Sequence, residues 1–204
     1  SMLVDALKAA SNDADDEAIQ KALIFISRCQ NLESEHNTTP HGAKNPDGGF
    51  YYTPAAGGSS QAGETDRGGL RSYGSMTYAL LKGLVFSGLD AEDERVQACW
   101  KWLSEHYTLD VNPGFEHSSD PTAAYQGLFY YFHSMARALD LFGEEFVVDH
   151  DGVAHPWRQQ LCGRLIAMQR RDDGSWVNEN APRWWEGNPV LATAYALLTL
   201  GETL

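Results

Sequence analysis

The sequence has few cysteines, no long apolar run and no excess of basic residues. Its three cysteines, Cys29, Cys99 and Cys162, stand far apart without a Cys-x-x-Cys pair, which argues against a disulfide framework. No run of 18 apolar residues occurs, so we expect no membrane span. Asp and Glu number 28 against 15 Lys and Arg, whereas a nucleic-acid surface needs a basic stripe. We therefore expect an acidic globular protein that has no cofactor and does not bind nucleic acid.

The first residues indicate that the natural chain begins earlier. Ser1 and Met2 look like a remnant of cloning, and no signal peptide is visible after them. Leu3, Val4 and Leu7 have the spacing of a helix end, over about 2–11. We expect a truncated first helix, and no localisation is assigned.

Two internal repeats run along the chain. A shift of 77 positions places DADDEAIQ (13–20) on DAEDERVQ (90–97), and each reads as an acidic turn that starts a helix. A second repeat links YGSMTYALL (73–81), FHSMARALD (132–140) and VLATAYALL (190–198), whose small residues permit close packing. Repetition of this kind predicts a series of related helical hairpins.

Apolar residues spaced at i, i+3, i+4 and i+7 predict three amphipathic helices, near 15–31, 92–107 and 157–170. Their apolar stripes are Ile19, Leu23, Ile26 and Cys29; Val96, Cys99, Trp100 and Leu103; and Leu161, Leu165, Ile166 and Met168. Helices rich in small residues are predicted near 73–88, 123–142 and 188–200. The glycine-rich segment 32–72 is predicted to be a loop, and negligible sheet is expected.

Each amphipathic helix leads toward a glycine–aromatic turn: DGGF (47–50), NPGF (112–115) or DGSW (173–176). The last of these belongs to LIAMQRRDDGSW, which resembles the QW repeat of terpenoid cyclases such as squalene–hopene cyclase. Leu165, Gln169, Gly174 and Trp176 stand in the places of that repeat. LATAYALLTL (191–200) is similar to the helix that follows such a turn, and protein prenyltransferase β-subunits share the architecture.

The resemblance implies an all-α fold, a segment of an α/α toroid in which outer helices surround a ring of inner helices. About three hairpins are present, so we expect a single domain over 1–204 that forms part of a ring. A missing segment or a second copy of the chain would supply the other half.

The catalytic groups of these families are not matched. The cyclase acid motif Asp-x-Asp-Asp occurs at 13–16, but the repeat places it on 90–93, which favours helix capping. The place that corresponds to the family motif, before the helix at 190–194, has no acid. Cys29, His36 and His41 fit no standard zinc spacing, so we expect no metal.

Candidate site residues cluster before and at the start of the small-residue helices. Aromatic walls with a few charged and amide groups are typical of ligand sites. The binding candidates are Arg71, Tyr73, Tyr125, Gln126, Tyr130, Tyr131, Trp184, Trp185 and Asn188. The catalytic candidates are Asp66, Asp120, His133 and Glu186. The alternative is structural: these aromatics fill the ring, acid–arginine pairs lock loops, and His133 is a core residue.

Three functions follow. The resemblance favours the binding of an apolar or polyprenyl-like small molecule in an aromatic central cavity, where ring faces could also stabilise a carbocation. The first alternative is a non-catalytic module that binds a peptide, a glycan or a partner chain. The second is a glycan-active hydrolase or lyase that uses Asp66, Asp120 or Glu186 as acid or base.

Overall fold

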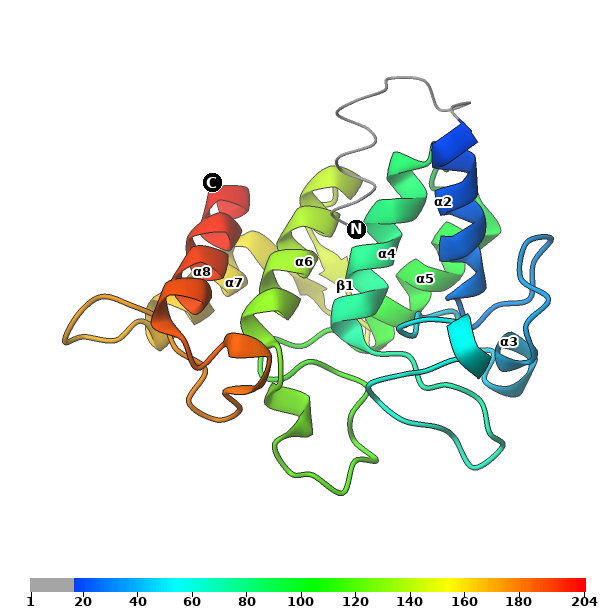
Figure 1. The fold of residues 1–204 in the computed structure, drawn as a ribbon. Helices are drawn as coiled ribbons and strands as arrows, with labels where there is room; N and C mark the ends of the chain where they lie inside the picture. Colours follow the sequence, from blue (N-terminus) through cyan, green and yellow to red (C-terminus); the bar gives the residue numbers. More distant parts are fainter. Residues whose placement is uncertain (1–16) are drawn as a thin grey trace. The chain divides into compact units, whose positions relative to one another are not determined.

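The computed structural model describes residues 17–204, and this part of the chain is predominantly helical (Figure 1). The described residues form seven α-helices and one small antiparallel sheet, in which β1 (Val147–Val148) pairs with β2 (Ala154–His155). The predicted all-α class is therefore confirmed, with as little sheet as expected. The predicted helix over 2–11 and the acidic motif at 13–16 lie outside the described residues.

The chain divides into two compact units, one up to Leu103 and one from Ser104 onward. A single domain over 1–204 and a toroidal arrangement both stay predictions. None of the helices described between residues 17 and 204 is long and apolar enough to cross a membrane.

The first unit contains α2 (Glu17–Arg28), α3 (Pro40–Lys44), α4 (Gly74–Phe86) and most of α5 (Glu94–Glu105). The predicted stripe of α2 is buried as expected. On α5, Val96, Cys99 and Leu103 are buried, but Trp102 is buried where the periodicity favoured Trp100. The helices predicted near 15–31, 73–88 and 92–107 thus occur. The last two are shorter than predicted by less than a turn at each end, and the first ends at Arg28.

The long segment between α2 and α4 contains the short helix α3 and a 3₁₀ turn at Ala55–Gly57, is otherwise the predicted loop, and helps to build the core. Asn31 Nδ2 donates to Leu70 O at 2.7 Å and to Ser72 Oγ at 2.9 Å, which ties the two ends of the segment together. Phe50 and Tyr51, near its middle, are fully buried. Buried aromatic rings and side-chain bonds to the backbone therefore order a segment that has little regular secondary structure.

The second unit contains α6 (Leu128–Phe142), α7 (Trp157–Met168) and α8 (Pro189–Thr203), with 3₁₀ turns at Ala123–Tyr125 and Arg183–Trp185. The helix predicted from residue 123 begins at Leu128, because Gly127 has a φ of 69° and interrupts the backbone. The apolar stripe predicted for α7 is wrong at Ile166, whose side chain is exposed.

Helix α8 packs against both α6 and α7, which lies behind them in Figure 1. Two alanines of α8, Ala192 and Ala196, are fully buried there. Small side chains at these positions let the helix axes approach closely, as the composition of the segment predicted.

Candidate functional site

Gln169 and Trp176 donate three of the hydrogen bonds that hold the glycine–aromatic turn of the second unit. Gln169 Nε2 donates to Gly174 O at 2.8 Å, and Gly174 takes a left-handed φ of 74°. The Trp176 backbone N–H donates to Thr193 Oγ1 at 3.1 Å, and the indole Nε1 donates to Leu165 O at 2.8 Å. The buried tryptophan thus joins the end of α7 to the first turns of α8.

The turn of the first unit repeats this pattern. Gln30 Nε2 donates to Gly48 O at 2.9 Å, and Gly48 has a φ of 80°. The Phe50 backbone N–H donates to Thr77 Oγ1 at 3.1 Å. Gln30 differs from Gln169 in being buried and in donating also to Arg95 O at 2.8 Å. The two turns share a hydrogen-bond scheme even though 17 residues separate Gln30 from Gly48 and only four separate Gln169 from Gly174.

Several predicted site residues of the second unit meet at the start of α6. Gln126 Nε2 donates to Asp120 Oδ2 at 3.0 Å, and Arg183 Nη1 donates to Gln126 Oε1 at 3.2 Å. Bonds from the hydroxyl and the backbone N–H of Thr122 lower the pKa of Asp120. A general acid that works near neutral pH needs a raised pKa, so this geometry favours a structural role for Asp120 as a loop brace.

Glu186 is the most deeply buried of the candidate acids. Its Oε1 accepts from the Tyr130 backbone N–H at 2.8 Å, and its Oε2 accepts from Asn178 Nδ2 at 2.8 Å. Burial raises the pKa of this carboxyl, although the bonds from Asn178 and from the backbone of Tyr130, Phe129 and Leu128 oppose the shift. Glu186 therefore caps α6 by satisfying N–H groups that have no partner within the helix.

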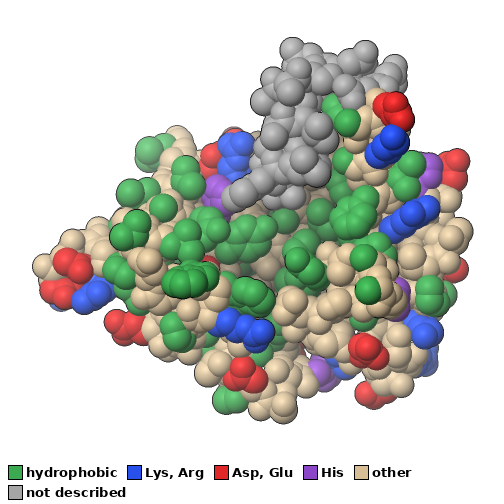
Figure 2. Space-filling view, viewed as in Figure 1, with side chains coloured by type: hydrophobic (Ala, Val, Ile, Leu, Met, Phe, Trp, Pro, Cys, Tyr) green, Lys and Arg blue, Asp and Glu red, His purple; other side chains and the backbone are tan. Residues whose placement is uncertain are grey.

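Aromatic side chains form a surface beside this cap. The Tyr195 ring centroid lies 5.9 Å from that of Tyr130 and 5.7 Å from that of His133. Trp184 and Trp185 in the adjoining turn are 51% and 78% exposed. We call these five residues the aromatic surface. Figure 2 shows hydrophobic side chains gathered over α8 and α6.

The two tryptophans of the aromatic surface have an unusual backbone. Trp184 has a φ of 61° and Trp185 a φ of 64°, values that bulky residues rarely adopt. The Arg183 guanidinium stacks 4.7 Å from the Trp184 ring. The Asn188 backbone N–H donates to Trp185 O at 2.9 Å. Neighbouring contacts thus hold a backbone conformation that presents two indoles to solvent.

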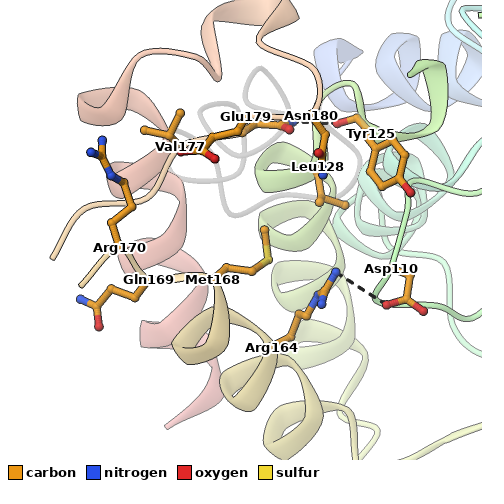
Figure 3. A pocket seen from close by; sticks show the side chains of 11 residues that line it. Asp110, Tyr125, Leu128, Arg164, Met168, Gln169, Arg170, Val177, Glu179 and Asn180 are labelled. Atoms are coloured by element: carbon orange, nitrogen blue, oxygen red, sulfur yellow. Dashed lines mark hydrogen bonds and ion pairs between the residues drawn. The ribbon is translucent and has the colours of Figure 1, made fainter. Parts of the chain in front are cut away.

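A separate pocket of about 290 Å³ opens at the end of α7 (Figure 3). Its lining mixes both signs of charge with amide and apolar groups. The residues are Asp110, Tyr125, Leu128, Arg164, Met168, Gln169, Arg170, Val177, Asn178, Glu179 and Asn180. Of the predicted binding residues only Tyr125 contributes. The spacing of Arg164 and Met168, one turn apart on α7, could have indicated a shared face, but the approach of segment 177–180 is a tertiary feature.

The remaining candidates of the second unit have structural roles. Tyr131 is fully buried, and its hydroxyl donates to Thr108 O at 2.8 Å. Asn188 caps α8, because its Oδ1 accepts from the Val190 backbone N–H at 2.9 Å. Both side chains are therefore bound within the fold.

The candidates of the first unit lie around its long loop. Asp66 is exposed, whereas Tyr73 is buried and its backbone N–H donates to Phe50 O at 3.2 Å. Arg71 Nε donates to Glu64 O at 3.1 Å, which braces the loop. These contacts favour the structural interpretation of Arg71 and Tyr73.

The described residues contain no group of three His, Cys, Asp or Glu side chains that could hold a metal ion. Burial raises the pKa of the Cys29 thiol to about 12 and also raises that of Cys99. These two thiols therefore stay protonated near neutral pH and are poor nucleophiles.

Comparison with known families, curated proteins and solved structures found no significant match to this chain.

Proposed function

We propose that this chain is a non-catalytic binding module that holds an apolar or polyprenyl-like small molecule on the aromatic surface. The fold proposed with it is a segment of an α/α toroid. The repeated helices and the hydrogen-bond scheme common to the two turns support that architecture.

The engagement of the candidate acids supports binding rather than catalysis. The Glu186 carboxylate accepts hydrogen bonds from the start of α6 and from Asn178, and Asp120 is bonded within its own loop. His133 packs beside the Tyr195 ring. An acid–base mechanism needs a carboxyl that can reach a substrate, and the hydrogen bonds that Glu186 and Asp120 accept within the fold oppose that role for both.

The exposed apolar side chains beside the aromatic surface are the main reason for proposing an apolar ligand. Val190, Leu197 and Leu198 on α8 are 77%, 57% and 56% exposed. Covering apolar surface is worth about 25 cal/mol per Å², so a flexible hydrocarbon chain laid along α8 would bind with useful affinity. Indole and phenol rings add flat contact area for isoprenoid methyl groups.

The test is a titration of the purified chain with farnesol, read by tryptophan fluorescence. We expect a blue shift as the exposed indoles leave water, and at least about a tenfold loss of affinity in Trp185→Ala and Leu197→Ala. Phe146→Ala is the matched control, because Phe146 is also exposed in the second unit but lies outside the aromatic surface. Unchanged affinity in both test variants would refute this site.

Two further measurements separate the alternatives. Incubation with squalene or farnesyl diphosphate should give no product by mass spectrometry, and a cyclised or transferred product would refute the non-catalytic proposal. Light scattering over a range of concentrations should give a monomer. If a dimer forms and Leu197→Ala disrupts it, α8 binds a second copy rather than a small molecule.

A further inference from the structure

We propose that the pocket at the end of α7 is a second binding site, which takes a small zwitterion with an apolar body, such as an apolar amino acid or a dipeptide. This site shares no residue with the aromatic surface and does not depend on the function proposed for that surface. Its lining residues all belong to the second unit.

Arg164 provides the positive end of the pocket. Its Nε donates to Leu109 O at 3.1 Å, which fixes the plane of the guanidinium. Its Nη2 lies 3.6 Å from Asp110 Oδ1, longer than a charge-assisted hydrogen bond, and the Asp110 side chain is 84% exposed. A ligand carboxylate can displace the weakly held Asp110 carboxylate and accept two parallel hydrogen bonds from the Arg164 guanidinium.

Glu179 provides the negative end. In Figure 3 it lies across the pocket from Arg164, with Met168 between them. Its carboxylate can accept hydrogen bonds from a ligand ammonium, and the neighbouring Asn180 amide offers a further acceptor. Opposite charges at two ends select a ligand that carries both signs.

Other polar groups of the lining are already occupied by the fold. Arg170 Nη2 is paired with Asp172 Oδ2 at 2.8 Å, and Gln169 is bonded to Gly174 O. Asn178 Nδ2 donates to Tyr125 O and to the Glu186 carboxylate. Recognition of ligand charge therefore falls to Arg164 and Glu179.

Apolar groups between the charged ends determine the size and character of the ligand body. Met168, Leu128 and Val177 line this part of the pocket, and a methionine thioether adapts to differently shaped neighbours. A volume of about 290 Å³ is at the small end of the range for ligand pockets, so the body is limited to one or two residues.

The test is isothermal titration of the full chain with leucine and with glycyl-leucine, using N-acetyl-leucinamide as the uncharged analogue. We expect at least one zwitterion to bind and the uncharged analogue to bind at least about tenfold more weakly. The stronger of the two zwitterions identifies the ligand length. Absence of binding by both, or equal binding of the uncharged analogue, overturns the proposal.

Variants assign the contacts. Arg164→Gln and Glu179→Gln should each weaken binding at least about tenfold, with folding checked by circular dichroism because Arg164 also bonds to Leu109 O. Arg171→Gln is the control, because Arg171 is exposed beside the pocket without lining it. Asp110→Asn should strengthen binding several-fold, since it removes the competing carboxylate on an exposed side chain. Weaker binding in Asp110→Asn, or unchanged binding in Arg164→Gln and Glu179→Gln, overturns the assignment.

Discussion

The sequence Tyr-Ala-Leu-Leu occurs in α4 and again in α8, but the two copies differ in burial. In α4, Leu80 is 7% exposed and Leu81 is fully buried. In α8, the corresponding Leu197 and Leu198 are more than half exposed. The same two leucines in the same kind of helix therefore contribute to a core in one unit and to a surface in the other.

The neighbours of each helix account for part of this difference. Gly83 of α4 has no side chain, so Ile26 of α2 packs directly on it, and Cys99 Sγ of α5 lies 3.7 Å from Thr77 O. In the second unit α6 and α7 both contact α8, yet the outward leucines stay exposed. Local sequence determines that a helix forms, whereas packing determines which of its faces is buried.

The largest expected effect concerns the turn of the second unit. Trp176→Ala should destabilise the protein by about 3 to 5 kcal/mol, because it removes a buried indole together with its bond to Leu165 O. Trp185→Ala, which truncates an indole in the same unit that is 78% exposed, should change stability by less than about 0.5 kcal/mol. Urea unfolding followed by circular dichroism measures both, and equal losses would contradict the buried role of Trp176.

The paired leucines test the comparison of α4 with α8 directly. Leu80→Ala should cost about 2 to 5 kcal/mol as a core truncation, and Leu197→Ala less than about 0.5 kcal/mol. The same unfolding experiment ranks the two variants. If Leu197→Ala lost as much stability as Leu80→Ala, the face of α8 that carries Leu197 would be buried in solution.

Replacing the buried glutamine of the first turn should likewise cost more stability than replacing the exposed glutamine of the second. Gln30→Ala leaves the carbonyls of Gly48 and Arg95 without their partner in a buried place, so we expect a loss of about 1 to 3 kcal/mol. Gln169→Ala removes one bond at an exposed turn, for which about 0.5 to 1 kcal/mol is expected. Thermal unfolding of the two variants compares them, and a reversed order would show that burial does not decide the cost.

The smallest effects are expected from pH, with opposite signs in the two units. Because the pKa of Glu186 is raised in the folded state, this carboxyl contributes fully to folding stability below its ordinary pKa of 4.5. That contribution is lost as the pH rises through the folded-state pKa. The Arg95 guanidinium, bonded to Asp93 at 2.8 and 2.9 Å, lowers the pKa of that carboxyl. The contribution of Asp93 is present above 3.8 and is lost as pH falls through the lowered pKa.

Stability measured from pH 3 to 7 by urea unfolding, in roughly unit steps, separates the two groups. Glu186→Gln should remove the decline in the free energy of unfolding above pH 4.5. Asp93→Asn should remove part of the decline in the same quantity at acid pH. If Glu186→Gln leaves the upper part of the profile unchanged, ionisation of the Glu186 carboxyl is not linked to folding.

Prediction from sequence succeeded for features that depend on nearby residues. Apolar spacing placed α2, α5 and α7, and small residues marked α4 and α8. It failed at Gly127, which delays the start of α6, and at Ile166, whose place in the stripe did not ensure burial. Whether a periodic apolar residue is covered depends on which segment passes over it, and a single helix does not contain that information.

In the candidate site, too, the positions of residues were predicted from sequence but their contacts were not. Aromatic and charged residues were expected at the starts of the small-residue helices, and Asp120, Gln126, Tyr130 and Glu186 do meet at the start of α6. Their chemistry was decided by three-dimensional contacts: the Glu186 carboxylate is used to cap a helix that begins 58 residues earlier in the sequence. The pocket at the end of α7 was not predicted, because its lining comes from four separate segments of the chain.

The sequence by itself determined the approximate positions of the six longer helices, the glycine–aromatic turns that follow α2 and α7, and the acidic character of the chain. These properties follow from side-chain periodicity, backbone freedom at glycine and residue counts, all of which are local. Only the tertiary structure decided that Leu80 is buried while Leu197 is exposed, that Tyr131 is a core residue, and that Arg164 and Glu179 face a common pocket. Burial and the pairing of charges depend on residues distant in sequence, and folding alone brings those residues together.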